Sequence, residues 1–423
     1  MSIKHGEIIA IGDELISGRV LNTTSCFAAD RLFNAGYAIK RITVIGDDPD
    51  DINECLLRAV DRSSFVIISG GLGPTSDDIT NEVAAKALGR RLVRNEGIMK
   101  RLEECRVSGR CPADFPMDKL AMLPEAAEEL NPSGHAAGYY LRHNGVILFF
   151  LPGVPEQLRE HLIRRVLPTL EKINGRQPGG LKKTFRIFGR SEIELNMLIA
   201  PIDRKYRDIK VGYYPNFPEV FVSLSMLEDR DGKAYFDSMC REVRALLAEN
   251  ITGEDDETLE KNIGRLLIRK KARLAVAESC TGGMMGRQIT SVPGSSAWFE
   301  MGVVTYANNA KRKLLGVSEG TLAAHGAVSS ETAAEMAEGV RKLAGSDYAL
   351  SITGIAGPGG GSEQKPVGTV FIGMTTPEKT VAERFLFQGR REQIRTISVA
   401  AALDWLRRHL SFGSYIPGIK TAA

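Results

Sequence analysis

Short apolar runs alternate with amphipathic stretches through the first 170 residues. Residues 6–12, 38–46 and 64–71 are apolar runs of strand length, and residues 23–35 and 51–61 between them have helical periodicity. Strands that are apolar on both faces are typical of a parallel sheet covered by helices on both sides. The pattern therefore predicts an α/β domain.

The pattern changes at residues 172–180, where Gly, Pro and polar residues are typical of a linker. Short strands and two helices follow over residues 182–253 and predict a small α+β module. Strands and helices then alternate again, which indicates a second α/β layered domain. We expect two separate α/β domains joined by an α+β module, with the three units at residues 1–175, 176–254 and 255–423.

Composition narrows the class of partner. The chain has 55 basic and 52 acidic side chains, and they are interspersed, so no long-range field attracts a polyanion. Nucleic acid is therefore not an expected partner. The longest apolar run, residues 146–151, has the length of a strand, and charges appear too early for a signal peptide. We expect a cytoplasmic protein without a membrane partner, and a homodimer as the commonest oligomeric state.

The cysteines give no sign of a metal site. They are scattered without CxxC spacing, which fits reduced thiols in a cytosol better than disulfides or zinc ligands. The six are Cys26, Cys55, Cys105, Cys111, Cys240 and Cys280.

A serine turn follows the apolar strand at residues 273–279. The sequence from Ser279 to Gly283 leads directly into a helix, so the serine hydroxyl is expected at the carboxyl end of a strand. Unpaired amides of residues 281–283 would point at a ligand there and could form an oxyanion hole. The alternative is an ordinary glycine-rich turn.

A serine nucleophile needs a base, and none of the six histidines stands where a triad member would. Tyr306 lies at another strand end, and Lys311 follows five residues later at a helix start, so both could point into the same crevice. Lys311 could act as the base if burial or nearby positive charge lowers its pKa, and Tyr306 could relay the proton. The alternative for Lys311 is a solvated surface lysine.

A glycine-rich segment at residues 351–362 follows a third apolar strand. Its amides could approach a phosphate or ribose closely. It is not a Walker A loop, because no GK[ST] closes it. A purely structural loop remains the alternative.

The motifs AESCTGG, TYANNAK, SITGIAGPGGG and KPVGTV together resemble the C-terminal domain of the CinA family, whose members include nicotinamide mononucleotide deamidases. The resemblance implies that Ser279, Tyr306 and Lys311 act together on a carboxamide, without a cofactor. Arg390 departs from the family pattern, which often has Asp there, while Arg391 and Arg395 keep their places. The residues expected to bind substrate are Thr281, Gly282, Gly283, Thr353, Gly354, Gly357 and Arg391.

The expected chemistry is hydrolysis of the carboxamide. Ser279 attacks, ammonia leaves, and water converts the acyl-enzyme to nicotinic acid mononucleotide. The pyridinium charge would help to keep Lys311 deprotonated. Cys280 is the rival nucleophile because thiols are intrinsically stronger, but the resemblance assigns Ser279, and adjacent strand residues face opposite ways.

A second group of loops follows the strands of the first domain. Ligands of open parallel sheets bind beyond the carboxyl ends of the strands, where glycine amides could hold phosphates and carboxylates a divalent cation. The alternative is helix capping by Thr75 and the aspartates. The expected site residues are Gly12, Asp13, Glu14, Asn22, Gly70, Gly71, Gly73, Thr75, Asp77 and Asp78, with Asp13 and Asp78 as metal ligands.

The motifs GDEL, GxxxNT, VIGDD, GGLGPTSDDIT and PGVP in this first domain resemble the molybdopterin-binding fold that begins CinA proteins. The resemblance implies a metal-dependent ADP-ribose pyrophosphatase. The middle unit resembles the KH-type module, but residues 189–192 lack the second glycine of a GXXG loop, which favours a spacer or a dimerisation element. We expect a two-activity enzyme of pyridine nucleotide salvage that acts on small nucleotides; a nucleotide- or pterin-binding adaptor and a molybdenum-cofactor protein are the alternatives.

Overall fold

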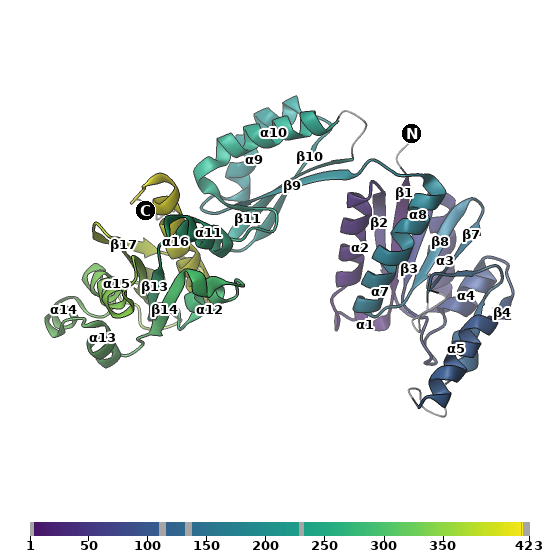
Figure 1. Cartoon of the computed structure of the whole chain (residues 1–423), viewed down its shortest axis with the longest axis horizontal. Coiled ribbons are helices and arrows are strands. Elements are labelled where there is room, and N and C mark those ends of the chain that lie inside the picture. The colour runs from purple at the N-terminus through teal and green to yellow at the C-terminus, as the bar shows by residue number, and fades with distance from the viewer. Residues whose placement is uncertain (1–3, 110–115, 132–137, 228–231, 416, 418–423) are drawn as a thin grey trace. The chain divides into compact units, whose positions relative to one another are not determined.

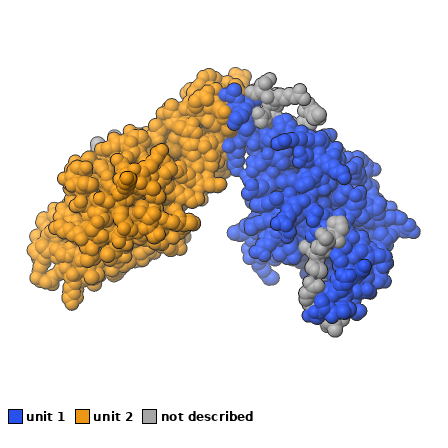
Figure 2. Space-filling view, in the orientation of Figure 1, with its two compact units in different colours: residues 1–182, 226–234 blue, residues 183–225, 235–423 orange. Residues whose placement is uncertain are grey.

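The computed structural model describes residues 4–109, 116–131, 138–227, 232–415 and 417. The chain divides into two compact units (Figure 2). The first unit comprises residues 1–182 and 226–234, and the second comprises residues 183–225 and 235–423. Most of the expected middle module thus belongs to the second unit, and the division into three units stays a prediction.

The first unit is built on a six-stranded sheet with the order β2-β1-β3-β8-β7-β6 (Figure 1). The first four strands are parallel, but β7 and β6 are antiparallel to their neighbours. Only Asn144 and Gly145 connect β7 to β8, both with positive φ, and such a two-residue turn reverses the chain. The parallel pairing expected for the strands at residues 6–12, 38–46 and 64–71 is confirmed, and the antiparallel edge beyond β8 is an addition to it. The strands are β1 (His5–Ile11), β2 (Ala38–Ile45), β3 (Phe65–Ser69), β6 (Glu128–Glu129), β7 (Tyr139–His143) and β8 (Val146–Leu151).

Helices cover both faces of this sheet, as expected. Ile8 packs with α2, α7 and α8, while its neighbour Ile9 packs with α3 and α4 on the other face, because successive strand residues point to opposite sides. A two-stranded ribbon of β4 (Leu92–Arg94) and β5 (Met122–Pro124) lies apart from the main sheet. The helices are α1 (Asp13–Ile16), α2 (Thr23–Asn34), α3 (Pro49–Arg62), α4 (Thr80–Ala87), α5 (Glu96–Val107), α6 (Met117–Ala121), α7 (Pro155–His161), a π-helical turn (Leu162–Val166) and α8 (Leu167–Asn174).

The second unit begins with a four-stranded sheet of order β10-β11-β9-β12. Its helix α9 starts with a capping box, in which Ser191 and Glu194 each satisfy the other's backbone amide. The elements are β9 (Gly180–Ile187), α9 (Glu192–Lys205), β10 (Lys210–Asn216), β11 (Glu219–Leu227), α10 (Gly232–Leu247), a 3-10 turn (Ala248–Asn250) and β12 (Ile251–Glu254).

A five-stranded sheet of order β14-β13-β15-β16-β17 forms the rest of the second unit. Strands β14, β13 and β15 are parallel, and β16 and β17 are antiparallel. Helices α11, α12 and α16 pack on one face and α13 and α15 on the other, so this is a second α/β layered structure. The strands are β13 (Leu274–Glu278), β14 (Phe299–Val304), β15 (Tyr348–Gly354), β16 (Thr369–Thr375) and β17 (Thr380–Leu386); the helices are α11 (Leu259–Lys270), α12 (Met284–Thr290), α13 (Asn308–Leu315), α14 (Glu319–His325), α15 (Ser330–Ala344) and α16 (Arg391–Phe412), with a 3-10 turn at Ser295–Ala297.

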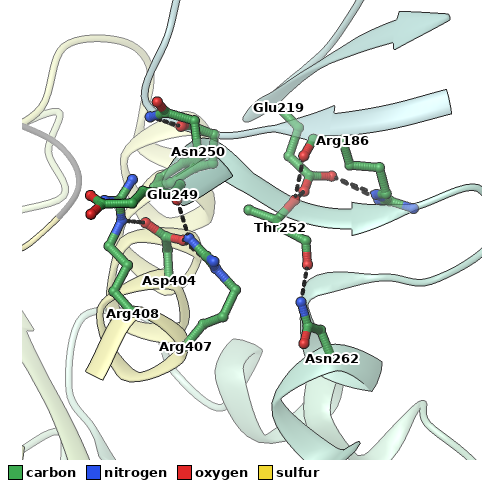
Figure 3. Close-up of polar contacts among 10 residues, drawn as sticks. Arg186, Glu219, Glu249, Asn250, Thr252, Asn262, Asp404, Arg407 and Arg408 are labelled. Carbon is green, nitrogen blue, oxygen red and sulfur yellow. Dashed lines mark hydrogen bonds and ion pairs between the residues drawn. The ribbon is translucent and has the colours of Figure 1, made fainter. Parts of the chain in front are cut away.

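Buried charged groups join α16 to the 3-10 turn before β12 (Figure 3). The Asp404 carboxylate accepts hydrogen bonds from Arg407 and Arg408, and both arginines also reach Glu249, through its carbonyl and its carboxylate respectively. Asp404 is 1% exposed and Arg407 2%. This network ties the four-stranded sheet to the α/β layers of the same unit.

The structure bears on the expectations about the cysteines and about membrane-spanning segments. Cys105 is disulfide-bonded, so the prediction of reduced thiols is wrong at that position, while Cys26, Cys55, Cys240 and Cys280 are free and Cys111 lies outside the described residues. Among the described residues, no helix combines the length and the apolar character that crossing a membrane requires.

Candidate active site and a second cavity

Ser279 lies at the carboxyl end of β13, a strand paired on both sides. Its amide donates to the Ile352 carbonyl of β15 at 2.9 Å, which extends the sheet pairing to the serine itself. Gly282 and Gly283 then take positive φ values of 60° and 92°, which turn the chain from the strand into α12. Ser279 is 8% exposed, and the pairing of β13 with β15 fixes its main chain.

Lys311 lies in the first turn of α13 with its amine against Ser279. Its Nζ is 3.0 Å from Ser279 Oγ, 2.7 Å from the Thr305 carbonyl oxygen and 3.2 Å from the Tyr306 carbonyl oxygen. The side chain is 1% exposed, and no carboxylate among the described residues forms an ion pair with it. Burial lowers the pKa of Lys311.

This geometry suits a neutral amine. A neutral amine has two N–H bonds and one lone pair, and here two carbonyl oxygens accept while one hydroxyl can donate. The carbonyls of Thr305 and Tyr306 can take the two N–H groups, which leaves the lone pair for the hydroxyl hydrogen of Ser279. This is the arrangement that a serine nucleophile and a lysine base would need.

Tyr306 contacts Lys311 through its main-chain carbonyl and not through its side chain. Its ring is 63% exposed, and the phenol hydroxyl has no hydrogen-bond partner in the part of the chain that the structure describes. Its carbonyl, in contrast, accepts from Lys311. The structure therefore brings Ser279 and Lys311 together but does not bring the Tyr306 hydroxyl to either of them.

Cys280 has an environment that disfavours a thiolate. It is 8% exposed, and burial raises its pKa to about 11. Because the thiolate is the reactive form of cysteine, a thiol with this pKa is a poor nucleophile at neutral pH. This favours Ser279 over Cys280.

The amides expected to form an oxyanion hole are only partly free. Gly282 donates to the Ser279 carbonyl at 3.1 Å, and Gly283 donates to the Glu278 carboxylate at 3.1 Å. The expectation of three unpaired amides at residues 281–283 is therefore wrong for these two glycines. Among the described residues, no other residue accepts a hydrogen bond from the amides of Cys280 and Thr281.

Two arginines of α16 bridge the neighbouring loops. Arg391 donates to the Gly357 carbonyl at 2.6 Å, and Arg395 donates to the Thr281 carbonyl at 2.7 Å. Arg390 is the N-cap residue of α16. The Thr353 hydroxyl donates to the Ala327 carbonyl at 2.6 Å, so it helps to hold the glycine-rich loop that begins at Gly354, the last residue of β15.

The first unit holds a separate cavity of about 490 Å³ at the carboxyl ends of β1, β3 and β8. Tight loops shape it: a Cβ at Gly70 would lie 2.1 Å from the Ile11 carbonyl oxygen, so no larger residue fits there. The lining residues are Ile11, Gly12, Glu14, Asp47, Gly70, Gly71, Leu72, Gly73, Pro74, Asp77, Asp78, Leu120, Pro152, Gly153, Val154 and Gln157.

Three expected residues of this site do not line the cavity. Asn22 caps α2 by accepting the Ser25 amide, and its expected role in the site stays a prediction. The amide and hydroxyl of Thr75 donate to the Asp78 carboxylate within the loop. The N-cap of α4 is Ile79, which makes no side-chain capping hydrogen bond, so the capping alternative is wrong for Thr75 and the aspartates. Asp13 exchanges backbone-to-carboxylate hydrogen bonds with Asp47.

Comparison with known proteins places both sites in one family. The model for the CinA C-terminal domain matches residues 256–410, and the model described as "Probable molybdopterin binding domain" matches residues 7–172. A CinA-like protein of Desulfotalea psychrophila is 44% identical over 410 residues, covering 96% of this chain and 98% of the relative. The chain belongs to the CinA family. A CinA-like protein of Geobacter metallireducens is 42% identical over 406 residues, covering 95% of this chain and 98% of the relative.

Among solved structures, a competence-damaged protein (CinA) superfamily member from Klebsiella pneumoniae is 37% identical. It covers 36% of this chain and 96% of its own, with a TM-score of 0.35. The two family models, at residues 7–172 and 256–410, cover the two regions in which the sequence motifs predicted sites.

The acidic loops of this CinA chain partly fit a divalent cation. Burial raises the pKa of Asp47, and the negative charges of the neighbouring Asp13 and Glu14 carboxylates raise it further, because like charges gather at this end of the sheet. No Lys or Arg stands among the described residues that line it. However, no three His, Cys, Asp or Glu residues of the described chain lie close enough to form a metal site by themselves, and a cation would need oxygens from substrate or water.

Sequence reasoning missed residues at both sites. Asp47 lies in the GDD motif that follows β2, and its position beyond a strand end was a usable signal. Gln157 gave none, because it belongs to an ordinary amphipathic helix. Glu278 was hidden in an apolar strand, and its three hydrogen bonds to α12 emerge only in the structure.

Proposed function

We propose that the C-terminal part of this chain is a nicotinamide mononucleotide deamidase, with Ser279 as nucleophile and Lys311 as base. The observation that carries the proposal is the buried contact between Lys311 Nζ and Ser279 Oγ, in which the amine has no carboxylate partner and its pKa is lowered by burial. Burying a lysine without a carboxylate partner lowers the stability of the fold. Buried groups with shifted pKa values occur mainly at functional sites, which favours a chemical role for Lys311. Membership of the CinA family supports the choice of reaction.

Acylation uses the two groups in sequence. Ser279 Oγ attacks the carboxamide carbon while its proton passes to Lys311 Nζ, and the carbonyl electron pair moves to oxygen. Lys311 then returns the proton to the departing nitrogen, the C–N bond breaks, and ammonia leaves an ester on Ser279. The fixed positive charge of the pyridinium ring disfavours a second cation nearby, which helps Lys311 to begin as a neutral amine.

Deacylation repeats the same proton transfers with water. Lys311 takes a proton from the attacking water, the ester bond breaks, and the proton returns to Ser279 Oγ. The products are nicotinic acid mononucleotide and free enzyme. In this mechanism Tyr306 acts through its carbonyl, which helps to hold the Lys311 amine in place.

The test is ammonia release from nicotinamide mononucleotide by the purified full chain. Ser279→Ala is expected to abolish release, and Cys280→Ala is expected to keep it. Loss in the cysteine variant with retention in the serine variant would reverse the assignment. Binding of the nucleotide without any ammonia release by the wild type would support the adaptor alternative instead.

We also propose that the first unit is a metal-dependent ADP-ribose pyrophosphatase. The specific observation is a cavity of about 490 Å³ lined by glycine loops and four carboxylates, Glu14, Asp47, Asp77 and Asp78, which fits a phosphate-bearing ligand only if a cation accompanies it. A divalent ion held by these residues would neutralise charge on the phosphoryl oxygens. The glycine amides would orient the nucleotide.

This second activity is tested by incubating the chain with ADP-ribose, with and without Mg²⁺ or Mn²⁺. AMP and ribose phosphate should form only with metal. Tight pterin binding without cleavage of ADP-ribose would favour the molybdenum-cofactor alternative. Both activities belong to pyridine nucleotide salvage, which we propose as the cytoplasmic role of a homodimeric protein.

A further inference from the structure

Glu278 is a buried carboxylate that the proposed mechanism does not use. It is the last residue of β13 and is 1% exposed. Its Oε2 accepts the amides of Gly283 and Met285, each at 3.1 Å, and its Oε1 accepts the amide of Gly286 at 2.8 Å. Among the described residues, no Lys or Arg contacts it, so backbone amides alone compensate this group.

These hydrogen bonds decide which amides of the serine turn remain free. The amides of Gly283, Met285 and Gly286 end on Glu278, and the amide of Gly282 ends on the Ser279 carbonyl. Within the described chain, only the amides of Cys280 and Thr281 in this turn donate to no other residue. Both directly follow the nucleophile, where backbone donors for an oxyanion commonly lie.

The peptide that follows Thr281 is held from both sides. Its carbonyl accepts from Arg395 at 2.7 Å, and its N–H, that of Gly282, donates to the Ser279 carbonyl at 3.1 Å. With this peptide fixed and the first turn of α12 fixed on Glu278, the turn has little freedom to rotate. The main-chain carbonyl of Glu278 also accepts from Thr305, whose own carbonyl receives Lys311.

We propose that Glu278 is a positioning residue: it binds the first-turn amides of α12 and thereby fixes the serine turn so that the amides of Cys280 and Thr281 stabilise the oxyanion. This inference rests on the proposed amidase function, which it deepens. It differs from a simple helix cap, because a cap stabilises the fold without affecting the rate of the chemical step in folded protein.

The first experiment separates these two roles with Glu278→Gln. The amide side chain has only one acceptor oxygen, and its NH₂ group faces a backbone N–H, so the turn must shift. We expect kcat for ammonia release to fall by about 10²-fold, the size of effect that loss of one oxyanion donor produces, while KM changes by less than about threefold.

The matched control is Glu219→Gln in the four-stranded sheet. Glu219 is also a buried carboxylate with three hydrogen bonds, from Arg186 and Thr252, and it lies outside the serine turn (Figure 3). Both variants should lower Tm, but only Glu278→Gln should lower kcat of the folded enzyme. A Glu278→Gln enzyme with wild-type kcat, or with a change confined to KM, would overturn the proposal.

The second experiment does not depend on the nicotinamide substrate. A fluorophosphonate reacts with an activated serine: Oγ forms a bond to phosphorus, fluoride leaves, and the hydroxyl proton passes to Lys311. Labelling of Ser279, followed by intact mass, should be at least about tenfold slower in Glu278→Gln, because the phosphoryl oxygen needs the same amide donors. Ser279→Ala is the blank.

The two experiments together distinguish the two ways of failing. If the wild type releases no ammonia but labels at Ser279, and Glu278→Gln labels slowly, the substrate is wrong and the positioning role stands. If Glu278→Gln labels as fast as the wild type, the positioning role is wrong whatever the substrate.

Discussion

The serine site and the cavity of the first unit differ in how their polar groups are satisfied. At the serine site, Lys311 Nζ has three acceptors or donors around it, and Glu278 has three amides. At the cavity, Asp47 faces other carboxylates, and burial together with their charge raises its pKa. At the first site Ser279 and Lys311 are already in contact, although the hydroxyls of Thr281 and Thr305 beside them are buried without a partner among the described residues. The second site lacks positive charge among its described lining residues.

This difference teaches what each site needs. A site whose nucleophile and base are already in contact can react as soon as substrate arrives. A site where like charges gather needs a partner to bring the opposite charge, and a phosphate ester alone would add to the repulsion. We therefore expect the two proposed activities to respond in opposite ways to metal and to base substitution.

Lys311→Met should give the largest effect. It keeps the apolar stem but removes the base, and loss of general base catalysis should lower kcat for ammonia release by about 10³-fold. Lys313→Met, an exposed lysine on the same helix, is the matched control and should leave the rate unchanged. Retained activity in Lys311→Met would contradict the proposed mechanism, because Lys311 would then not be the base.

Metal removal should separate the two sites most sharply. A chelator should abolish ADP-ribose cleavage and leave ammonia release intact. Asp47→Asn should weaken the metal-dependent reaction by about 10- to 100-fold, whereas Asp61→Asn, an exposed carboxylate on α3, should not. Equal sensitivity of both reactions to the chelator would contradict the comparison.

The pH profile of ammonia release should show the base directly. Because burial lowers the pKa of Lys311, the neutral amine becomes available at lower pH than for an ordinary lysine. As pH falls through that lowered pKa, Lys311 becomes protonated and kcat/KM should drop by about tenfold per pH unit. A limb set by the ordinary lysine pKa of about 10.4 would show that the amine is not desolvated in solution.

Tyr306→Phe should have the smallest effect. The phenol hydroxyl has no partner among the described residues, and the main-chain carbonyl that receives Lys311 survives the substitution. We expect ammonia release within about threefold of wild type. A loss of about 10²-fold, the size of a proton-transfer contribution, would instead support the relay by the hydroxyl.

The layered folds followed from patterns that the sequence displays openly. Apolar runs separated by amphipathic helices predicted both α/β layers, because strands buried on two faces need apolar residues throughout. The antiparallel edge formed by β7 and β8 was missed, although Asn144-Gly145 is a strong two-residue turn signal between apolar runs.

The sequence motifs predicted which residues belong to the sites. They did not predict which groups those residues would hydrogen-bond. The proximity of Ser279 to Lys311 was expected, and their contact is 3.0 Å. Glu278 was not recognised, because a single carboxylate at the end of an apolar strand does not reveal that three amides will meet it. Asp404, Arg407 and Arg408 have the spacing of a solvated helix face, yet all three are buried.

The network around Asp404 has a practical consequence for excising the proposed amidase as a fragment. A fragment that starts at residue 255 would omit Glu249, whose carbonyl and carboxylate receive Arg407 and Arg408. Arg407, which is 2% exposed, would lose the carbonyl acceptor of Glu249 at a cost of about 1–3 kcal/mol. Arg408 would lose a carboxylate that is itself 63% exposed, which should cost less. A stand-alone C-terminal fragment should therefore begin before the 3-10 turn at Ala248. It then keeps the hydrogen bonds from Arg407 and Arg408 of α16 to Glu249.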